Sequence, residues 1–201
     1  PLPLIERLVR AFPNAWFADA YGLTETVSGD TFLDKRKTVE RLGSVGKPCL
    51  HLEVQIWDEQ DRPVGADTLG EIVLRGPKVF KGYWKDEAAT AAAFRGGWFH
   101  TGDIGRLDGD GFLYIADRKK DLIISGGENI ASPEIERVLY EHPAVLEASV
   151  VGRPDPRWGE VPMAFVVFRE GQTASAEELM EFCRARLARF KVPRAVRVIE
   201  A

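Results

Sequence analysis

The chain has 201 residues, 45% of them apolar, and a formal net charge of −4. This length and composition predict one large or two smaller domains with hydrophobic cores, and the charge argues against a general nucleic-acid binder, which needs a basic face. No apolar run reaches the ~18–20 residues of a membrane span, and Cys49 and Cys183 lack the spacing of a metal or disulfide motif. We expect a reduced, cytoplasmic protein.

The N-terminal segment has the pattern of half an α/β unit. Apolar residues recur at helical spacing from Pro3 to Phe12, which predicts an amphipathic helix. The apolar run 16–18 predicts a short buried strand, and the polar loop 19–25 follows it. Because ligands bind at strand ends in open α/β sheets, this loop is a candidate site. The partner strands are expected before residue 1.

Short alternating strands are predicted between Gly43 and Ala116. They are separated by turn signals at the spacing typical of a small antiparallel barrel or sandwich. The strands expected here are 52–56, 72–74 and 112–116. The Ala-rich insertion 86–94 predicts a short helix.

The last part of the chain has an α+β pattern. Its sheet is predicted from the strands 145–151, 164–168 and 195–199. One helix is predicted to start at Ser132 as N-cap, with Pro133 at its first position. A second is predicted after a capping box of Ser175 and Glu178, with its apolar face reaching Phe190. Three strands and two helices can bury one core in a domain of about eighty residues.

The predicted fold class is therefore multi-domain, α/β and β. Residues 1–42 would end an α/β subdomain, 43–118 would form a small antiparallel β-barrel, and 119–201 would form a small α+β domain.

The segment Trp98–Asn129 holds several candidate ligand groups, which are expected at strand ends and turns. The carboxylate of Asp103 can accept both vicinal hydroxyls of a ribose, and Arg118 can add donors to the same sugar or to a phosphate. The plainer interpretations are an Asx turn for Asp103 and a weak surface ion pair for Arg118. Residues 125–127 could line a narrow passage or simply form a bend.

The loop YGLTE, residues 21–25, offers a second set of groups. Tyr21 could stack on an aromatic base, and Gly22 would let backbone approach a ligand closely. Thr24 could donate to a phosphate oxygen, and Glu25 could hold Mg²⁺. The same residues would equally suit a tight turn whose tyrosine closes the core.

Four motifs, in this order, resemble the adenylate-forming superfamily of acyl-CoA synthetases, firefly luciferases and peptide-synthetase adenylation domains. They are residues 21–25, 70–83, 98–103 and 117–130. The segment PDPRWGE, residues 154–160, looks like the CoA-ligase branch. The resemblance covers essentially the whole chain and implies the C-terminal portion of an acyl-CoA synthetase for a fatty or aromatic acid. Residues 1–118 would end its large AMP-binding domain, and 119–201 would be its small C-terminal domain.

In that family an acid and ATP form an acyl-adenylate and pyrophosphate, and the CoA thiol then displaces AMP. The residues that the resemblance implies for binding ATP and AMP are Tyr21, Gly22, Thr24, Asp103 and Arg118. Tyr21 would stack on adenine, Asp103 and Arg118 would hold the ribose, and Thr24 would contact the α-phosphate. Thr24 and Glu25 are the implied catalytic residues, with Glu25 as the Mg²⁺ ligand.

The resemblance also implies a moving second domain. Lys120 matches the family's hinge, and Ser125, Gly126 and Gly127 would line the tunnel for the pantetheine arm of CoA. One site cannot optimally stabilise both phosphoryl displacement and thiol attack, so two domain arrangements would share one adenylate.

Three features depart from the family pattern. Nothing matches the family's phosphate loop, the catalytic-lysine segment would come just after Ala201, and Ala20 replaces the glycine common before Tyr21. Because the chain starts without Met and stops just after a predicted strand, we expect it to be cut at both ends. Since the missing lysine would supply a large electrostatic contribution, we expect the 201 residues alone to be inactive in adenylation.

Two alternatives stay open: a non-enzymatic module for protein contacts, and the adenylation domain of a peptide synthetase. The segment 154–160 favours CoA over a carrier protein. Ile124 stands where luciferases resemble one another in having a lysine, which argues against their oxidation chemistry. The expected partners are a carboxylic acid, ATP and CoA, and a homodimer is the expected assembly.

Overall fold

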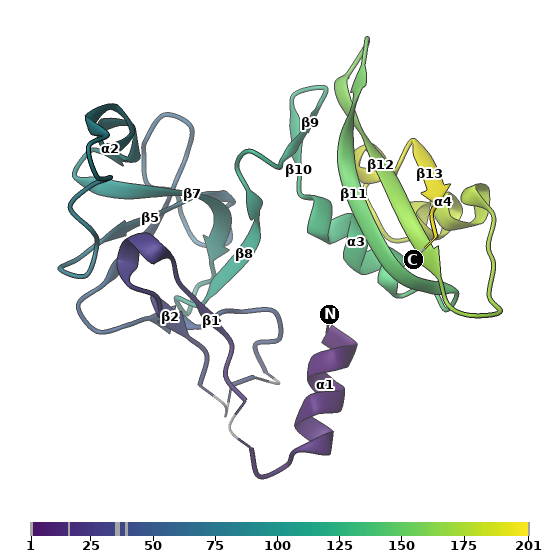
Figure 1. The fold of residues 1–201 in the computed structure, drawn as a ribbon, viewed down its shortest axis with the longest axis horizontal. Helices are drawn as coiled ribbons and strands as arrows, with labels where there is room; N and C mark the ends of the chain where they lie inside the picture. Colours follow the sequence, from purple (N-terminus) through teal and green to yellow (C-terminus); the bar gives the residue numbers. More distant parts are fainter. Residues whose placement is uncertain (1, 16, 35–36, 39, 201) are drawn as a thin grey trace. The chain divides into compact units, whose positions relative to one another are not determined.

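The computed structural model contains two compact units, Pro1–Lys119 and Lys120–Ala201, each of which we describe by itself. The structure describes residues 2–15, 17–34, 37–38 and 40–200, and Figure 1 labels its helices and strands. Within these ranges, no helix has the length and apolar character needed to cross a membrane.

The first unit begins with helix α1 and a small antiparallel sheet, ordered β1–β2–β3. These elements are α1 (Leu2–Ala11), β1 (Ala20–Tyr21), the 3-10 helix η1 (Thr24–Thr26), β2 (Thr31–Phe32) and β3 (Lys47–Pro48). Helix α1 confirms the first predicted helix. The strand predicted at 16–18 is wrong for Phe17 and Ala18, and Trp16 lies outside the described residues. The strand starts instead at Ala20, because residues 20–21 are the ones that pair with 31–32.

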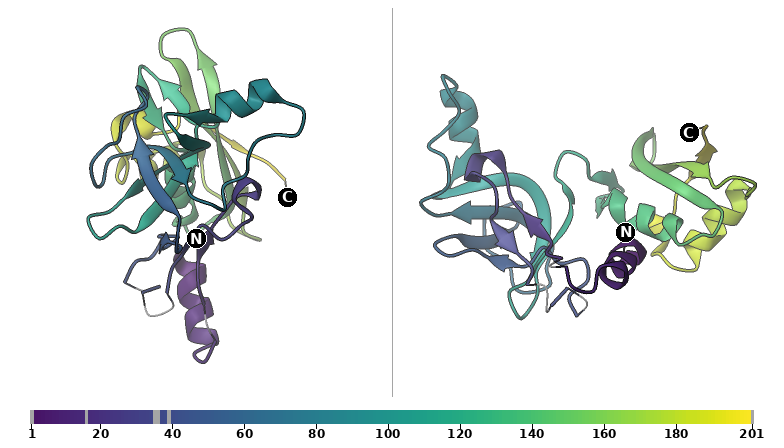
Figure 2. Two further views of the ribbon diagram at one scale, coloured as in Figure 1. Left: turned by 90° about the vertical axis from the view of Figure 1, so that its left-hand side faces the viewer. Right: turned by 60° about the horizontal axis from the view of Figure 1, so that its bottom comes forward.

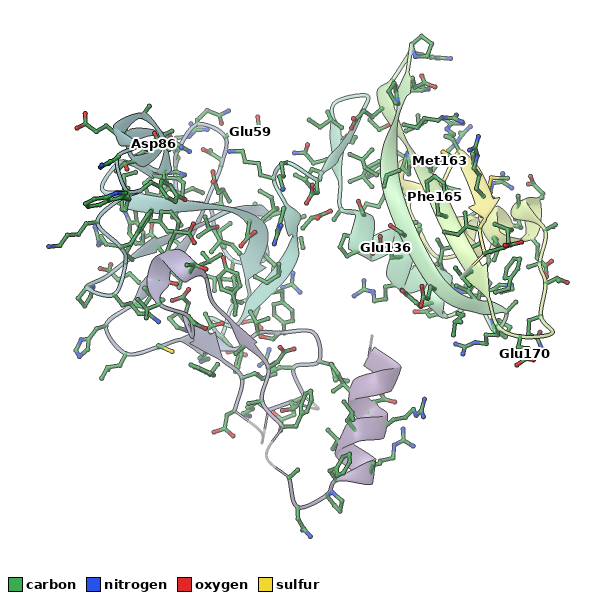
Figure 3. All side chains as sticks on the ribbon, in the orientation of Figure 1. Glu59, Asp86, Glu136, Met163, Phe165 and Glu170 are labelled. Carbon is green, nitrogen blue, oxygen red and sulfur yellow. The ribbon has the colours of Figure 1, made fainter. Side chains whose placement is uncertain are left out.

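The rest of this unit is a five-stranded antiparallel sheet, ordered β4–β5–β7–β6, with β8 also paired to β7. Its elements are β4 (Glu53–Trp57), β5 (Gly70–Arg75), α2 (Glu87–Ala93), β6 (Phe94–Arg95), β7 (Trp98–Leu107) and β8 (Leu113–Arg118). Asp86, labelled in Figure 3, caps α2 by accepting from the backbone N–H of Ala89 at 2.8 Å. The predicted strands and the Ala-rich helix are confirmed, while closure into a barrel stays a prediction.

Apolar side chains from this sheet form the core that carries the YGLTE loop. The buried residues are Leu52, Ile56, Ile72, Leu74, Phe99 and Leu113. Tyr21 and Leu23 pack against them from the loop. The loop is therefore fixed to the same sheet that holds Asp103.

The second unit is a five-stranded mixed sheet with two α-helices. Its elements are β9 (Ile123–Ser125), β10 (Glu128–Ile130), α3 (Ser132–Tyr140), β11 (Val145–Asp155), β12 (Gly159–Phe168), α4 (Ala176–Arg184), the 3-10 helix η2 (Arg189–Lys191) and β13 (Ala195–Val198). The strand order is β10–β9–β12–β11, and β13 runs parallel to β12. Figures 1 and 2 show β11 and β12 side by side as one long hairpin.

Side chains from both helices seal the core of this unit. Ile135 and Leu139 of α3 and Leu179 and Cys183 of α4 are fully buried. The carboxylate of Glu136, labelled in Figure 3, accepts from the backbone N–H of Val150 at 2.8 Å and ties α3 to β11.

Several predictions for this unit need correction. The sheet has five strands rather than three, because β9 and β10 join it. Strands β11 and β12 extend to the paired residues Asp155 and Gly159, since backbone pairing continues through polar residues and prolines that break the apolar pattern. Helix α3 has Ala131 as its N-cap, so Ser132 is already helical. Helix α4 ends at Arg184, which leaves Phe190 outside it and 42% exposed. The predicted cap by Ser175 is confirmed, with the N–H of Glu178 at 3.1 Å.

Taken by unit, the chain is an α/β protein with small mixed and antiparallel sheets.

Candidate functional site

A hydrogen bond joins two of the predicted site residues, Tyr21 and Asp103, which lie 82 residues apart in the chain. The phenol Oη donates to Asp103 Oδ2 at 2.7 Å. Burial and the neighbouring Asp103 carboxylate both raise the pKa of Tyr21 far above its ordinary value. The phenol therefore stays a proton donor, and it holds one carboxylate oxygen in a fixed orientation.

Asp103 lies in the middle of strand β7, which corrects the expectation of a turn. Its Cα partner across the antiparallel ladder is Arg118 of β8. Side chains of directly paired residues lie on the same face of the sheet and within reach of one another, so Asp103 and Arg118 share one face of the β7–β8 ladder. Asp103 is half-buried and Arg118 is exposed. The structure therefore brings together Tyr21, Asp103 and Arg118.

Gly22 is needed by the loop itself. A Cβ at this position would lie 2.3 Å from the backbone nitrogen of Gly29, far inside contact distance. The loop bends back on itself through three successive residues with positive φ, Val27, Ser28 and Gly29. Close packing of the chain on itself therefore explains Gly22 without a ligand.

A buried ion pair that the sequence prediction missed holds this loop. Asp30 is fully buried, and its Oδ1 lies 3.0 Å from Lys78 Nζ. The same ammonium donates to the carbonyls of Ser28 and Gly29, each at 2.7 Å. Lys78 belongs to the motif 70–83, but nothing in the spacing indicated that it reaches the YGLTE loop.

Thr24 and Glu25 lie in the 3-10 helix η1, with Thr24 exposed and Glu25 half-buried. Glu25 Oε1 accepts from the phenol of Tyr83 at 3.0 Å. Burial and the nearby Glu25 carboxylate raise the pKa of Tyr83, so it too remains a donor. Tyr83 is a second neighbour of the site that sequence reasoning missed.

The carboxylates described in the structure form no cluster of three or more groups able to hold a metal. Mg²⁺ is commonly held by one or two carboxylates together with substrate phosphates and water. The single carboxylate of Glu25 is enough for that mode of binding, because the nucleotide and water supply the other ligands.

The boundary between the two units falls directly before Lys120. On the first-unit side, the backbone N–H of Lys119 donates to the carbonyl of Gly102 at 2.7 Å, and its Nζ donates to Glu71 at 3.0 Å. Lys120 is exposed. Lys119 is thus anchored to the first unit, and the hinge role of Lys120 stays a prediction.

A surface pocket of about 660 Å³ in the second unit includes two of the predicted CoA residues. It is lined by Ser125, Gly126, Glu128, Arg157, Trp158, Val161, Pro162, Arg189, Phe190 and Arg194. Gly127 is exposed at the tip of the β9–β10 turn, has a positive φ, and is not among the lining residues. The pocket therefore combines two aromatic rings with three guanidinium groups.

Trp158 is fixed in this pocket by the turn that joins β11 and β12. Asp155 Oδ1 accepts from the backbone N–H of Arg157 at 2.9 Å and of Trp158 at 3.0 Å, and these bonds lower the pKa of Asp155. The guanidinium of Arg157 lies 4.8 Å from the centre of the indole ring. A Cβ on Gly126 would come within 2.8 Å of the same ring. The segment 154–160 is thus a rigid hairpin turn against the Gly126 backbone.

Two family models match the chain. The AMP-binding enzyme model matches residues 1–84, and the AMP-binding enzyme C-terminal domain model matches residues 134–201.

Curated relatives and solved structures match most of the chain. The 2-succinylbenzoate–CoA ligase of Bacillus velezensis is 49% identical over 196 residues, which cover 97% of this chain and 39% of that protein. A feruloyl-CoA synthase of Amycolatopsis is 46% identical over 180 residues, which cover 90% of this chain and 37% of that protein. The o-succinylbenzoate CoA synthetase of Bacillus subtilis, solved with its acyl-adenylate intermediate, has a TM-score of 0.89 and 44% identity, covering 99% of this chain and 40% of that one. The chain thus spans about two fifths of the length of these relatives.

Proposed function

Because the chain belongs to the AMP-binding enzyme family, we propose that it forms part of an ATP-dependent acid–CoA ligase that releases AMP and pyrophosphate. The observation that carries this proposal is the hydrogen bond between Tyr21 and Asp103, with Arg118 directly across the ladder. These three side chains offer an aromatic ring, a carboxylate and a guanidinium to one nucleoside.

In the adenylation half-reaction, the Asp103 carboxylate accepts hydrogen bonds from the two ribose hydroxyls. The Tyr21 phenol orients this carboxylate. Arg118 adds donors to the ribose, and the ring of Tyr21 packs beside adenine. Thr24, exposed on η1, donates to the α-phosphate. Glu25, oriented by Tyr83, is the protein ligand of the Mg²⁺ that accompanies ATP.

In the thioester half-reaction, the pocket of the second unit takes the nucleotide end of CoA. The phosphates of CoA suit Arg157, Arg189 and Arg194, since guanidinium groups bind phosphate oxygens in a bidentate manner. Its adenine ring suits the indole of Trp158. Ser125 and Gly126 form the wall along which the pantetheine arm passes, with Gly127 at its mouth.

Lys120 is the proposed pivot between these half-reactions. Support for this role is that Lys119 is held to the first unit by backbone and side-chain bonds, and that the boundary between the units falls directly before Lys120. We further propose that residues 43–118 form a small barrel and that residues 119–201 are the mobile domain. The proposed assembly is a homodimer.

The proposed substrate is an aromatic carboxylic acid. The two curated relatives are named as ligases for 2-succinylbenzoate and ferulate, both of which contain a benzene ring. The alternative of a fatty acid receives no support from these names.

The test is CoA-dependent AMP release by the complete ligase that contains this chain, measured with a panel of aromatic and fatty acids. We expect stoichiometric AMP, pyrophosphate and acyl-CoA with one or more aromatic acids. Release of ADP, or no CoA dependence with any acid, would overturn the proposed reaction. Turnover with fatty acids alone would overturn the substrate class only.

A further inference from the structure

A buried carboxylate, Glu71, lies behind the Asp103 segment of strand β7, and it is only 7% exposed. The pairing of β5 with β7 is irregular there. Glu71 pairs with Ile104 and Val73 pairs with His100, so β7 advances by four positions where β5 advances by two. Such a bulge leaves ladder groups unpaired and re-aims the side chains beside it.

Glu71 replaces the missing ladder contacts with its side chain. Its Oε1 accepts from the backbone N–H of Gly102 at 3.1 Å. Its Oε2 accepts from Lys119 Nζ on the chain just after β8, at 3.0 Å. The backbone N–H of Lys119 in turn donates to the carbonyl of Gly102 at 2.7 Å. One carboxylate therefore bonds both to β7 and to the end of β8.

Two further cationic or polar groups surround the same carboxylate. His100 Nδ1 lies 3.2 Å and Arg95 Nη2 lies 3.5 Å from Glu71 Oε2. A carboxylate buried this deeply is tolerated because it is paired and hydrogen-bonded, and removing its charge leaves several donors without a partner.

The position of these bonds connects them with the nucleoside site. Gly102 directly precedes Asp103 on β7, Lys119 directly follows Arg118, and Asp103 and Arg118 are ladder partners. The two hydrogen bonds of Glu71 thus fix the residue next to Asp103 and the residue next to Arg118. Gly102 has a φ of +75°, a conformation that favours glycine, and both of its backbone polar groups take part in these bonds.

We propose that Glu71 is a positioning residue for nucleotide binding: its carboxylate fixes β7 against the end of β8 and so sets the separation of Asp103 and Arg118 around the ribose. The proposal rests on the proposed function, because it assigns the ribose to this pair. Glu71 itself does not touch the nucleotide.

The test compares two nucleotides in the complete ligase: ATP, and 2′,3′-dideoxy-ATP, which lacks the hydroxyls that Asp103 would accept. In Glu71→Gln we expect the KM for ATP to rise about tenfold, the scale of one charge-assisted hydrogen bond. The KM for dideoxy-ATP should change by less than about twofold, because its binding does not use the ribose contacts.

Glu53→Gln is the matched control. Glu53 lies on β4 of the same sheet and pairs with Arg75 at 2.6 Å, but both side chains are exposed. Its loss should leave both KM values unchanged, since exposed ion pairs contribute little. If Glu71→Gln does not fold, Lys119→Met removes one of the two strand contacts from a half-exposed side chain, with an expected threefold rise for ATP alone.

An equal rise of both KM values in the variants would mean that Glu71 only maintains the fold, and an unchanged KM for ATP would remove it from the site. Asp103→Ala separates this failure from failure of the proposed function. If that variant still discriminates between the two nucleotides, the ribose assignment itself is wrong. If it loses the discrimination while Glu71→Gln and Lys119→Met keep it, only the positioning role falls.

Discussion

At the scale of single residues, hydrogen bonds decide which groups are available to a ligand. The Tyr21 hydroxyl donates a hydrogen bond to Asp103, and the Tyr83 hydroxyl donates one to Glu25. Each carboxylate is therefore oriented by a phenol, half-buried for Tyr21 and exposed for Tyr83, whose pKa is raised, so the phenol remains a donor. A carboxylate held in this way loses less rotamer entropy when a ligand arrives.

Asp103→Ala tests the ribose contact in the complete ligase. We expect the KM for ATP to rise by about tenfold or more, because hydrogen bonds to a charged acceptor contribute roughly 1.5–3 kcal/mol. Steady-state pyrophosphate release at varied ATP gives the value. Asp110→Ala, an exposed carboxylate at the β7–β8 turn that pairs with Arg41, serves as the control. A KM that stays at the wild-type value would remove Asp103 from the site.

The buried carboxylate of Glu71 predicts a loss of stability in acid. Burial works to raise its pKa, but the hydrogen bonds from Lys119 and His100 outweigh burial and hold the pKa below the ordinary value of 4.5. A lowered folded-state pKa means that its contribution is present above pH 4.5 and is lost as the pH falls through the folded-state pKa. Thermal unfolding of the chain at stepwise lower pH measures this. Glu71→Gln should flatten the acid limb, and an unchanged limb would contradict the assignment.

At the scale of elements, the second unit depends on a contact between two turns. The β9–β10 turn presents Gly126 to the indole of Trp158, and the Gly126 N–H donates to the Trp158 carbonyl at 2.8 Å. Two features of Gly126 exclude a side chain: its positive φ, and the Trp158 ring, which a Cβ would approach too closely. This contact shapes one wall of the proposed CoA pocket.

Gly126→Val should therefore impair the thioester step selectively. The added side chain would displace Trp158 and narrow the pocket, so we expect thioester formation from a preformed acyl-adenylate to slow about tenfold or more. Adenylation, followed by pyrophosphate release without CoA, should stay within about twofold. Gly171→Ala is the matched control, because Gly171 also has a positive φ, does not line the pocket, and a Cβ there meets no atom within 4 Å. Equal losses in both half-reactions would speak against a CoA role.

The link between the units gives a second prediction at this scale. Lys120→Pro fixes the φ angle at the proposed pivot, so we expect one half-reaction to slow more than the other. Single-turnover measurements of adenylation and of thioester formation separate the two. Lys120→Ala keeps the backbone free and should behave like the wild type. Equal slowing of both steps would count against a pivot at this residue.

At the scale of the whole molecule, the described residues form a hydrophobic core in each unit, and the chain aligns with about two fifths of the length of its relatives. The residues proposed for adenine, ribose and CoA are present, while nothing in the sequence resembles the family's phosphate loop or its catalytic lysine. Charge stabilisation on the transferring phosphate is a large part of such catalysis.

The 201 residues by themselves should accordingly not catalyse adenylation. ATP–pyrophosphate exchange by the purified chain, with aromatic acids at saturating concentration, is the measurement. We expect exchange at the level of the Asp103→Ala variant of the same chain. Exchange above that level would mean that these residues alone supply the phosphate chemistry.

Local pattern predicted much of the fold because strands and helices have short periods. The helices at 2–11 and 87–93 and the strands of the central sheet follow from spacing and capping residues. The local pattern placed other boundaries wrongly, at strands and helices whose ends are set by tertiary pairing rather than by composition. Strand β11 continues to Asp155 because β12 lies beside it, and helix α4 stops at Arg184 although apolar spacing continues.

The sequence by itself determined the order of the four motifs, the residue types at the candidate sites and the family that they resemble. Tertiary structure alone decided that Tyr21 reaches Asp103, that Asp103 lies within a strand opposite Arg118, and that Glu71 bonds to both flanking segments. The reason is physical: periodicity reports on neighbours a few residues apart, whereas these contacts depend on strand register and on a bulge that no local pattern encodes.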